Sequence, residues 1–290
     1  MEQQILQEKR DRTKLVLTNV YNLPAMSGTM KEVSEMLDDP NTNSQKLGKM
    51  IGRDQAIATK ILSIANSPMY GLRRKVTTID FAILVLGFLE IKKIVLALSL
   101  MESFKNKTDK YLDQKKFWLH SIITGSAAKR IAEDLGYRIG GEAFISGLLH
   151  DLGIPVIHKY FHSSFIEIVS AVESNNVVYN DAEISQLGYN HAEIGMFLTE
   201  KWNLPIELCD TILNHYSPSK ASENKVLASI VHLADYMTQK LGVGDFYWDA
   251  GIKLDETVYD ILKFSSEDDL NNFIEKYRGM FEEEVKSLNL

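Results

Sequence analysis

The stretch Leu148-Leu149-His150-Asp151-Leu152-Gly153 places an imidazole and a carboxylate side by side in an otherwise apolar, helical segment. Burying a polar group without a partner costs roughly 2–7 kcal/mol, so the folded chain must supply partners for both side chains. A divalent metal ion satisfies both, because neutral histidine and ionised aspartate are ordinary ligands for it. A hydrogen-bonded polar pair in the core is the alternative.

Four other segments bring a histidine or an aspartate to an inward-facing helical position. His120, for example, shares a helical face with Thr124, Ala127 and Ile131. The predicted metal ligands are His120, His150, Asp151, His191, His215 and Asp235. Neighbouring residues on a helix point about 100° apart, so His150 and Asp151 reach one ion only in a groove between helices, as in bundle metal centres.

Each of these residues also has a plainer interpretation. A lone histidine such as His120 or His191 is often a hydrogen-bonded core or cap residue, and Asp235 could pair with His232. His158 and His162 have the i, i+4 spacing of zinc helices. No glutamate follows the first of them and Lys159 lies beside it, so we expect both on the surface or at the rim of the site.

Composition narrows the class of protein. The 290 residues are 45% hydrophobic and 24% charged, which is typical of a globular protein. The formal net charge of −7 argues against a general nucleic-acid binder, despite the basic run Arg73-Arg74-Lys75. Cys209 is the only cysteine, so internal disulfides and zinc sites with two or four thiolates are excluded. No apolar run has the length of a membrane span or a signal peptide, so we expect a cytoplasmic protein without a membrane partner.

Apolar periodicity predicts an all-α chain. A polar, charged stretch, Lys105–Lys115, is the predicted boundary between two subdomains. Expected helices include Ile5–Val20, Glu142–Leu152 ended by Gly153 and Pro155, one opened by Asn190 with Glu193 as a capping box, and Ser222–Leu241. The predicted divisions are an N-terminal helix over 1–22, subdomains over 23–108 and 109–244, and an acidic helical extension over 245–290 that packs on the core without chemistry of its own.

His120, His150-Asp151 and Asp235 match the H…HD…D signature of the HD superfamily of metal-dependent phosphohydrolases, which the C-terminal part resembles. The N-terminal part resembles the HDOD domain, the HD-related output domain. The motifs that carry this likeness are Leu23–Met26, Ile51–Ala56, Lys60–Ser67, Thr78–Ile83 and Val85–Gly87. The resemblance spans roughly Leu23 to Leu241. It implies a helical N-terminal subdomain packed on an HD-like helical subdomain, and a role in bacterial signal transduction.

The related HD-GYP cyclic-dinucleotide phosphodiesterases place further ligands where this chain has His191, His215 and Asp235. The chain also departs from those enzymes. Their paired histidines appear here as Asn214-His215, their phosphate-contacting lysine is Ile154, and their Gly-Tyr-Pro motif is missing. Most HDOD members are thought to have lost the HD catalytic residues.

Two functions follow from the resemblance. The first is a regulatory signalling module with a metal site, in which a protein partner, a nucleotide or a cyclic dinucleotide binds in the groove between the subdomains. The alternative is a metal-dependent phosphohydrolase or cyclic-dinucleotide phosphodiesterase. Histidine and carboxylate ligands without thiolates suit iron, manganese, zinc, nickel or cobalt, so the sequence leaves the identity of the metal open.

Overall fold

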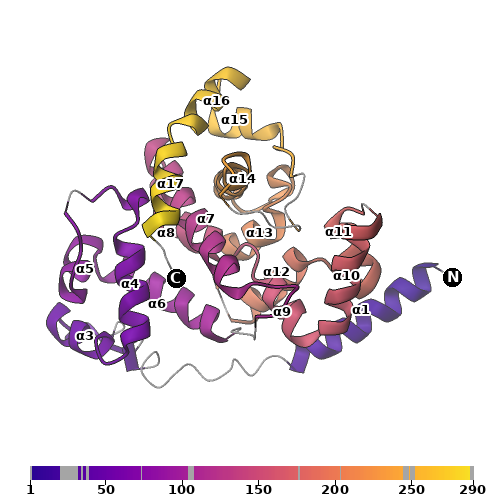
Figure 1. The fold of residues 1–290 in the computed structure, drawn as a ribbon, viewed down its shortest axis with the longest axis horizontal. Coiled ribbons are helices and arrows are strands. Elements are labelled where there is room, and N and C mark those ends of the chain that lie inside the picture. Colours follow the sequence, from indigo (N-terminus) through magenta and orange to yellow (C-terminus); the bar gives the residue numbers. More distant parts are fainter. Residues whose placement is uncertain are drawn as a thin grey trace.

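The computed structural model describes residues 2–19, 32–33, 35–36, 39–72, 74–103, 108–175, 177–202, 204–243, 248 and 252–287. All regular elements in these ranges are helices, which confirms the predicted all-α class (Figure 1). The motif Leu23–Met26, the residue Arg73 and the start of the predicted boundary at Lys105 lie outside the described residues. No helix among the described residues is both long enough and apolar enough to cross a membrane.

The predicted N-terminal subdomain is a set of short helices whose apolar side chains join the main core. Its elements are α3 (Ser44–Ile51), α4 (Gln55–Ala65), the short 3-10 helix η1 (Pro68–Tyr70), α5 (Ile79–Leu86) and α6 (Phe88–Ser103). Side chains cap two of the helices: Asn43 accepts a hydrogen bond from the Lys46 amide, and Thr78 accepts one from the Phe81 amide. α3 and α4 both pack against α5.

The predicted HD-like subdomain contains the longest described helix, α7. Its elements are α7 (Gln114–Asp134), α8 (Gly140–Leu149), α9 (Gly153–Tyr160), α10 (His162–Asn175), α11 (Tyr179–Leu187), α12 (His191–Lys201), α13 (Ile206–Asn214), η2 (Pro218–Lys220) and α14 (Lys225–Lys240). α7 and α8 touch backbone to backbone, because a Cβ on Gly147 would lie 2.9 Å from the Cα of Gly125. This close crossing brings His120 on α7 next to His150 at the end of α8.

The N-terminal helix α1 (Glu2–Asn19) packs on the HD-like subdomain, beside α10 and α11 in Figure 1. Thr13 Oγ1 donates a hydrogen bond to the Leu187 carbonyl at 2.7 Å, and Arg10 pairs with Glu193 at 3.0 Å. Leu17 joins the apolar cluster formed by α9 to α12. α1 therefore lies on the half of the molecule that holds the predicted ligands.

The C-terminal extension consists of α15 (Thr257–Leu262), α16 (Glu267–Glu275) and α17 (Arg278–Ser287). Its apolar residues join the main core, as predicted; they include Val258, Leu262, Ile274 and Phe281. Tyr277 Oη donates to Asp134 at 2.8 Å in the HD-like subdomain, and Ser67 Oγ donates to the buried Glu284 at 2.6 Å. The extension thus joins the two subdomains from outside.

Two predicted helices are wrong in detail. α8 ends at Leu149, and Gly153 begins the next helix instead of ending the previous one. Pro155 is tolerated in α9 because the amides of a helix's first turn need no intrahelical acceptor. α14 begins at Lys225, capped by Asn224, and not at Ser222. The helix α11 was missed because its apolar periodicity is weak.

Candidate metal centre

The six predicted ligands lie together at the centre of the HD-like subdomain. His120 comes from α7, His191 from the first turn of α12 and Asp235 from α14, while His150 and His215 directly follow α8 and α13. None of the six side chains has any exposed area. His150 and Asp151 occupy the turn between α8 and α9, and their side chains meet there, with His150 Nε2 3.2 Å from Asp151 Oδ2.

One group of ligand atoms consists of the Nε2 atoms of His120 and His150 and a carboxylate oxygen of Asp235. The two nitrogens lie 3.3 Å apart, and each is near Asp235 Oδ1, at 3.3 Å from His120 and 3.6 Å from His150. Asp151 Oδ2 lies 3.2 Å from His150 Nε2 and 3.7 Å from His120 Nε2. Ligands about 2.0–2.1 Å from a tetrahedral zinc ion stand about 3.3 Å from one another, which is close to all five distances.

The second group lies on the other side of Asp151. The other carboxylate oxygen of Asp151, Oδ1, is 3.5 Å from His191 Nε2 and 3.6 Å from His215 Nε2. Asp151 therefore faces two sets of ligand atoms with its two oxygens. The first set offers four ligand atoms and the second three.

Backbone and carboxylate acceptors determine which nitrogen of each imidazole carries the proton. His150 Nδ1 lies 2.7 Å from the Gly147 carbonyl, and His215 Nδ1 lies 2.7 Å from the Ile212 carbonyl. A carbonyl only accepts, so Nδ1 must be the protonated atom, which leaves the Nε2 lone pair directed at the centre. This is the arrangement in which a histidine binds a metal and its second nitrogen is held by an outer partner.

Glu183 on α11 likewise accepts the Nδ1 proton of His191. Its Oε2 lies 2.7 Å from His191 Nδ1 and accepts a hydrogen bond from the His191 amide at 3.0 Å. The helix start is fixed by the predicted capping box between Asn190 and Glu193. Gly153 permits the position, because a Cβ there would lie 2.0 Å from the His191 carbonyl oxygen.

Two further residues surround the centre. Trp248 is almost fully buried and its Nε1 donates a 2.8 Å hydrogen bond to Asp151 Oδ2. One alternative interpretation paired Asp235 with His232, but the described contacts of His232 are with other residues. Its Nδ1 bonds the His215 carbonyl at 2.8 Å, and its Nε2 accepts from the Asp255 amide at 2.9 Å. Glu183, Trp248 and the role of His232 were not predicted, since each acts through a contact between distant segments.

The electrostatics of this pocket favour positive charge. Burial would raise the carboxyl pKa of Asp151 and Asp235, but the neighbouring imidazoles outweigh burial and lower both. Burial would lower the pKa of His150, but the two carboxylates raise it well above its ordinary value. Burial and the charge of His150 lower the pKa of His215 to about 3. Two buried carboxylates thus attract a cation.

The chemistry of the donor set fits a divalent metal. Asp151 Oδ1, both Asp235 oxygens, His191 Nε2 and His215 Nε2 are buried and form no hydrogen bond with the described part of the chain. Native proteins rarely leave buried polar atoms unsatisfied, and the penalty is about 1–3 kcal/mol for each. A divalent cation held between donor atoms that lie 3.2–3.7 Å apart would satisfy these atoms.

The prediction for His158 was wrong. Its ring is only 5% exposed, although His162 is 49% exposed, and both rings approach Asp109. These three residues form a separate group of possible ligands. Cys209 is a buried free thiol, as expected.

Comparisons with known proteins agree with this architecture. The HDOD domain family model matches residues 23–218. An HDOD domain protein of unknown function from Geobacter sulfurreducens is 22% identical, with a TM-score of 0.74 over 98% of each chain. A proposed metal-dependent phosphohydrolase from Shewanella amazonensis SB2B is 17% identical, with a TM-score of 0.68 over 99% of each chain. At these identities the likeness shows the fold alone.

An uncharacterized protein of Treponema pallidum (strain Nichols) is 22% identical over 271 residues, which cover 93% of this chain and 52% of the relative. The chain thus spans about half the length of that curated relative. The family model covers about two thirds of the chain, from residue 23, after α1, to residue 218, the first residue of η2. The chain belongs to the HDOD domain family.

Proposed function

We propose that this chain is a bacterial signal-transduction module that acts in the cytoplasm by binding, and that its HD-like half holds a pair of divalent metal ions. His120, His150, Asp235 and Asp151 would hold one ion, and Asp151, His191 and His215 the other. The observation that carries the proposal is the closure of the site: all six ligands have zero exposure, and Trp248 bonds the Asp151 oxygen.

Metal ions bound there supply Lewis acidity and neutralise the buried carboxylates. The chain's own residues orient the ligands, through Glu183 and the carbonyls of Gly147 and Ile212. Groups that would bind a phosphodiester are replaced. Ile154 is fully buried in an apolar cluster, and Asn214 donates to Asp210 instead of facing the ligands. This supports a structural or sensory metal centre.

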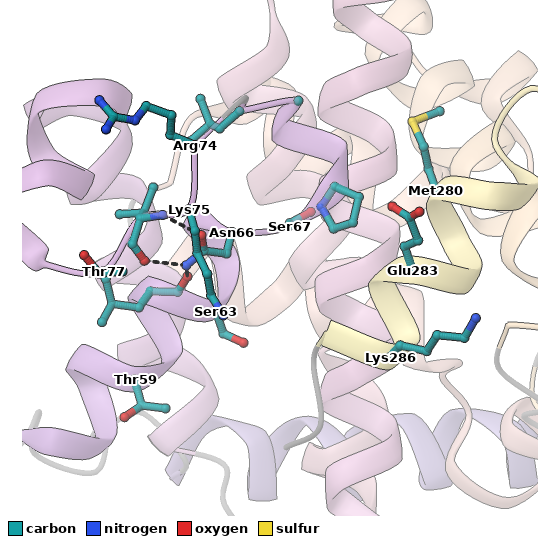
Figure 2. A pocket seen from close by; sticks show the side chains of 15 residues that line it. Thr59, Ser63, Asn66, Ser67, Arg74, Lys75, Thr77, Met280, Glu283 and Lys286 are labelled. Carbon is teal, nitrogen blue, oxygen red and sulfur yellow. Dashed lines mark hydrogen bonds between the residues drawn. The ribbon is translucent and has the colours of Figure 1, made fainter.

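A cleft between the N-terminal subdomain and the C-terminal extension supports the binding role. It has a volume of about 1030 Å³ and lies between α4, the segment after η1 and α17. Figure 2 shows Arg74 and Lys286 extending outward on opposite sides of the cleft, with Ser67 and Glu283 between them. Arg74, Lys75 and Lys286 outnumber the single carboxylate of Glu283 in its lining, so the cleft suits an anionic ligand such as a nucleotide or cyclic dinucleotide. A ligand there would lie beside the Ser67–Glu284 hydrogen bond, which joins the N-terminal subdomain to the C-terminal extension.

The alternative is a metal-dependent phosphohydrolase or cyclic-dinucleotide phosphodiesterase. One observation favours it: a single carboxylate, Asp151, faces two ligand sets, as in two-metal sites that hydrolyse phosphoesters. Access to such a site would require Trp248 to leave Asp151.

The test compares metal-loaded wild type with a His150→Ala, Asp151→Ala double variant. Bis(p-nitrophenyl) phosphate and cyclic dinucleotides serve as substrates. We expect no turnover in the wild type above that of the variant. Metal-dependent turnover that the double variant loses would overturn binding as the whole function and establish the hydrolase.

Calorimetry tests the cleft separately. We expect a cyclic dinucleotide to bind the wild type and to bind Lys75→Ala at least several-fold more weakly. Lys225→Ala, which removes an exposed cation at the start of α14, is the control and should bind like wild type. Equal affinity in all three proteins would remove the cleft from the proposal.

A further inference from the structure

A second group of metal-ligand side chains lies outside the buried centre, where the chain enters α7. It consists of Asp109, His158 and His162, whose ligand atoms lie within 4.8 Å of one another. His158 belongs to the last turn of α9, and His162 is the first residue of α10. The helix break at Phe161 turns the two rings toward each other, so that their centroids are 5.0 Å apart at 84°.

Asp109 is oriented for both histidines. Its Oδ1 accepts hydrogen bonds from the amides of Tyr111 and Leu112 at 2.8 and 3.0 Å. These bonds direct Oδ2 at the rings, 3.0 Å from His158 Nε2 and 3.5 Å from His162 Nε2. The His158 ring is itself held by an edge contact with Phe165. One carboxylate oxygen therefore faces two imidazole nitrogens in a site whose parts are already in place.

We infer that Asp109, His158 and His162 form a labile surface site for a divalent transition-metal ion such as Zn²⁺. The two oxygen–nitrogen distances are close to the spacing of about 3.3 Å between ligands of a tetrahedral zinc ion. Half-exposed His162 and partly exposed Asp109 leave room for water to complete the coordination. Two imidazoles and one carboxylate are a ligand set that suits zinc and its neighbours in the transition series.

Two lysines beside the site do not block it. Lys110 Nζ lies 4.6 Å from the centre of the Tyr111 ring, and Lys159 Nζ lies 5.6 Å from that of Tyr160. Both ammonium groups are therefore engaged with neighbouring tyrosines. Their positive charge weakens the site, which fits exchangeable binding and not permanent structural metal.

A bound ion would link the entry to α7 with the junction of α9 and α10. α7 carries His120, and α9 begins directly after Asp151 and Leu152. The surface site therefore joins two elements that also position the buried centre. It stabilises the folded protein by mass action, in proportion to the logarithm of free metal concentration.

Zinc titration by calorimetry tests the inference on protein whose surface metal has been removed by a brief chelator wash. Wild type should bind Zn²⁺ in a rapid, reversible phase. His162→Ala should weaken that phase at least tenfold, and Asp109→Asn should do the same while preserving the shape of the side chain. Ser163→Ala, an exposed neighbour on α10, should match wild type.

Thermal unfolding without zinc checks that the variants fold, and substitution of half-exposed His162 leaves the core intact. Equal zinc affinity in wild type and His162→Ala would overturn the inference, as would a wild type without a reversible phase. A failed buried centre would appear instead as missing tightly held metal, so the two outcomes are distinguishable.

Discussion

The two histidine–aspartate groups of this protein differ in how they are built. The buried centre draws its six candidate ligands from segments spread between His120 and Asp235, and none of them is exposed. The surface group takes two of its three ligands from neighbouring helix ends, and His162 is 49% exposed. Similar ligand types can therefore support different metal-binding behaviour. Burial controls how fast a bound ion exchanges with solvent, whereas the local sequence controls only how close the ligands lie to one another.

The largest expected difference is in the rate of metal release. A chelator should strip the surface group within the mixing time, whereas the buried centre should release metal only through local opening, orders of magnitude more slowly. Stopped-flow detection of released zinc with an absorbing chelator measures both phases. A single fast phase that carries all the metal would break the comparison.

Gly153→Ala should disturb the buried centre most strongly without removing a ligand. The new Cβ would lie 2.0 Å from the His191 carbonyl oxygen, so α9 and α12 must move apart. We expect the free energy of unfolding in urea to fall by roughly 1–3 kcal/mol or more, as for overpacked cores.

Gly279→Ala is the matched control. Gly279 lies in α17, and a Cβ there would meet nothing within 4 Å. Alanine is favoured over glycine in a helix by up to about 1 kcal/mol, so this variant should be as stable as wild type or slightly more stable. An equal loss of unfolding free energy in both variants would show that the close approach at Gly153 does not destabilise the alanine variant.

Glu183→Gln sharpens the comparison inside the buried centre. Glutamine can still accept the His191 Nδ1 proton but removes the charge that strengthens the ligand. Outer-partner substitutions typically weaken metal binding about 10–100-fold, and we expect that loss only for the His191 half. Competition with a chelator of known affinity measures it. Unchanged affinity in both halves would leave Glu183 a purely structural residue.

The smallest expected effect is on stability and concerns Asp255, whose amide donates to His232 beside the buried centre. Burial would raise its carboxyl pKa, but hydrogen bonds from Thr257 and Ser219 outweigh burial and lower it to about 2. A carboxyl pKa below the unfolded value stabilises the fold above that value, and the gain disappears as pH falls from about 4 toward 2.

Asp255→Asn should therefore lower the free energy of unfolding at pH 7 by up to about 1 kcal/mol, with the difference shrinking below pH 4. Metal-free protein is used so that metal release does not contribute. Asp260→Asn, at an exposed position on α15, is the control and should change little. A difference that persists unchanged at pH 2.5 would contradict the assigned hydrogen bonds.

Much of the buried centre could be predicted from sequence. Helical periodicity directed His120 inward, and the family motif marked His150, Asp151 and Asp235. These signals are local or ordered along the chain, so they survive without a structure. The all-α fold and the core packing of the C-terminal extension followed from the same periodicity.

The parts of the site that could not be predicted from the sequence depend on contacts between distant segments. Trp248 meets Asp151 across 97 positions, and Asp109 meets His158 across 49. Glu183 lies on α11, whose weak periodicity concealed the whole helix. His158 and His162 were judged as one helical face, although a helix break separates them.

Elemental analysis of wild type and Asp151→Asn, after a brief chelator wash to clear the surface group, tests the central claim most directly. Asp151 faces both ligand sets of the buried centre. We expect about one tightly held ion for each set in wild type and near-complete loss from both sets in the folded variant. Wild-type protein without tightly held metal, or an Asp151→Asn protein that retains all of it, would contradict the account.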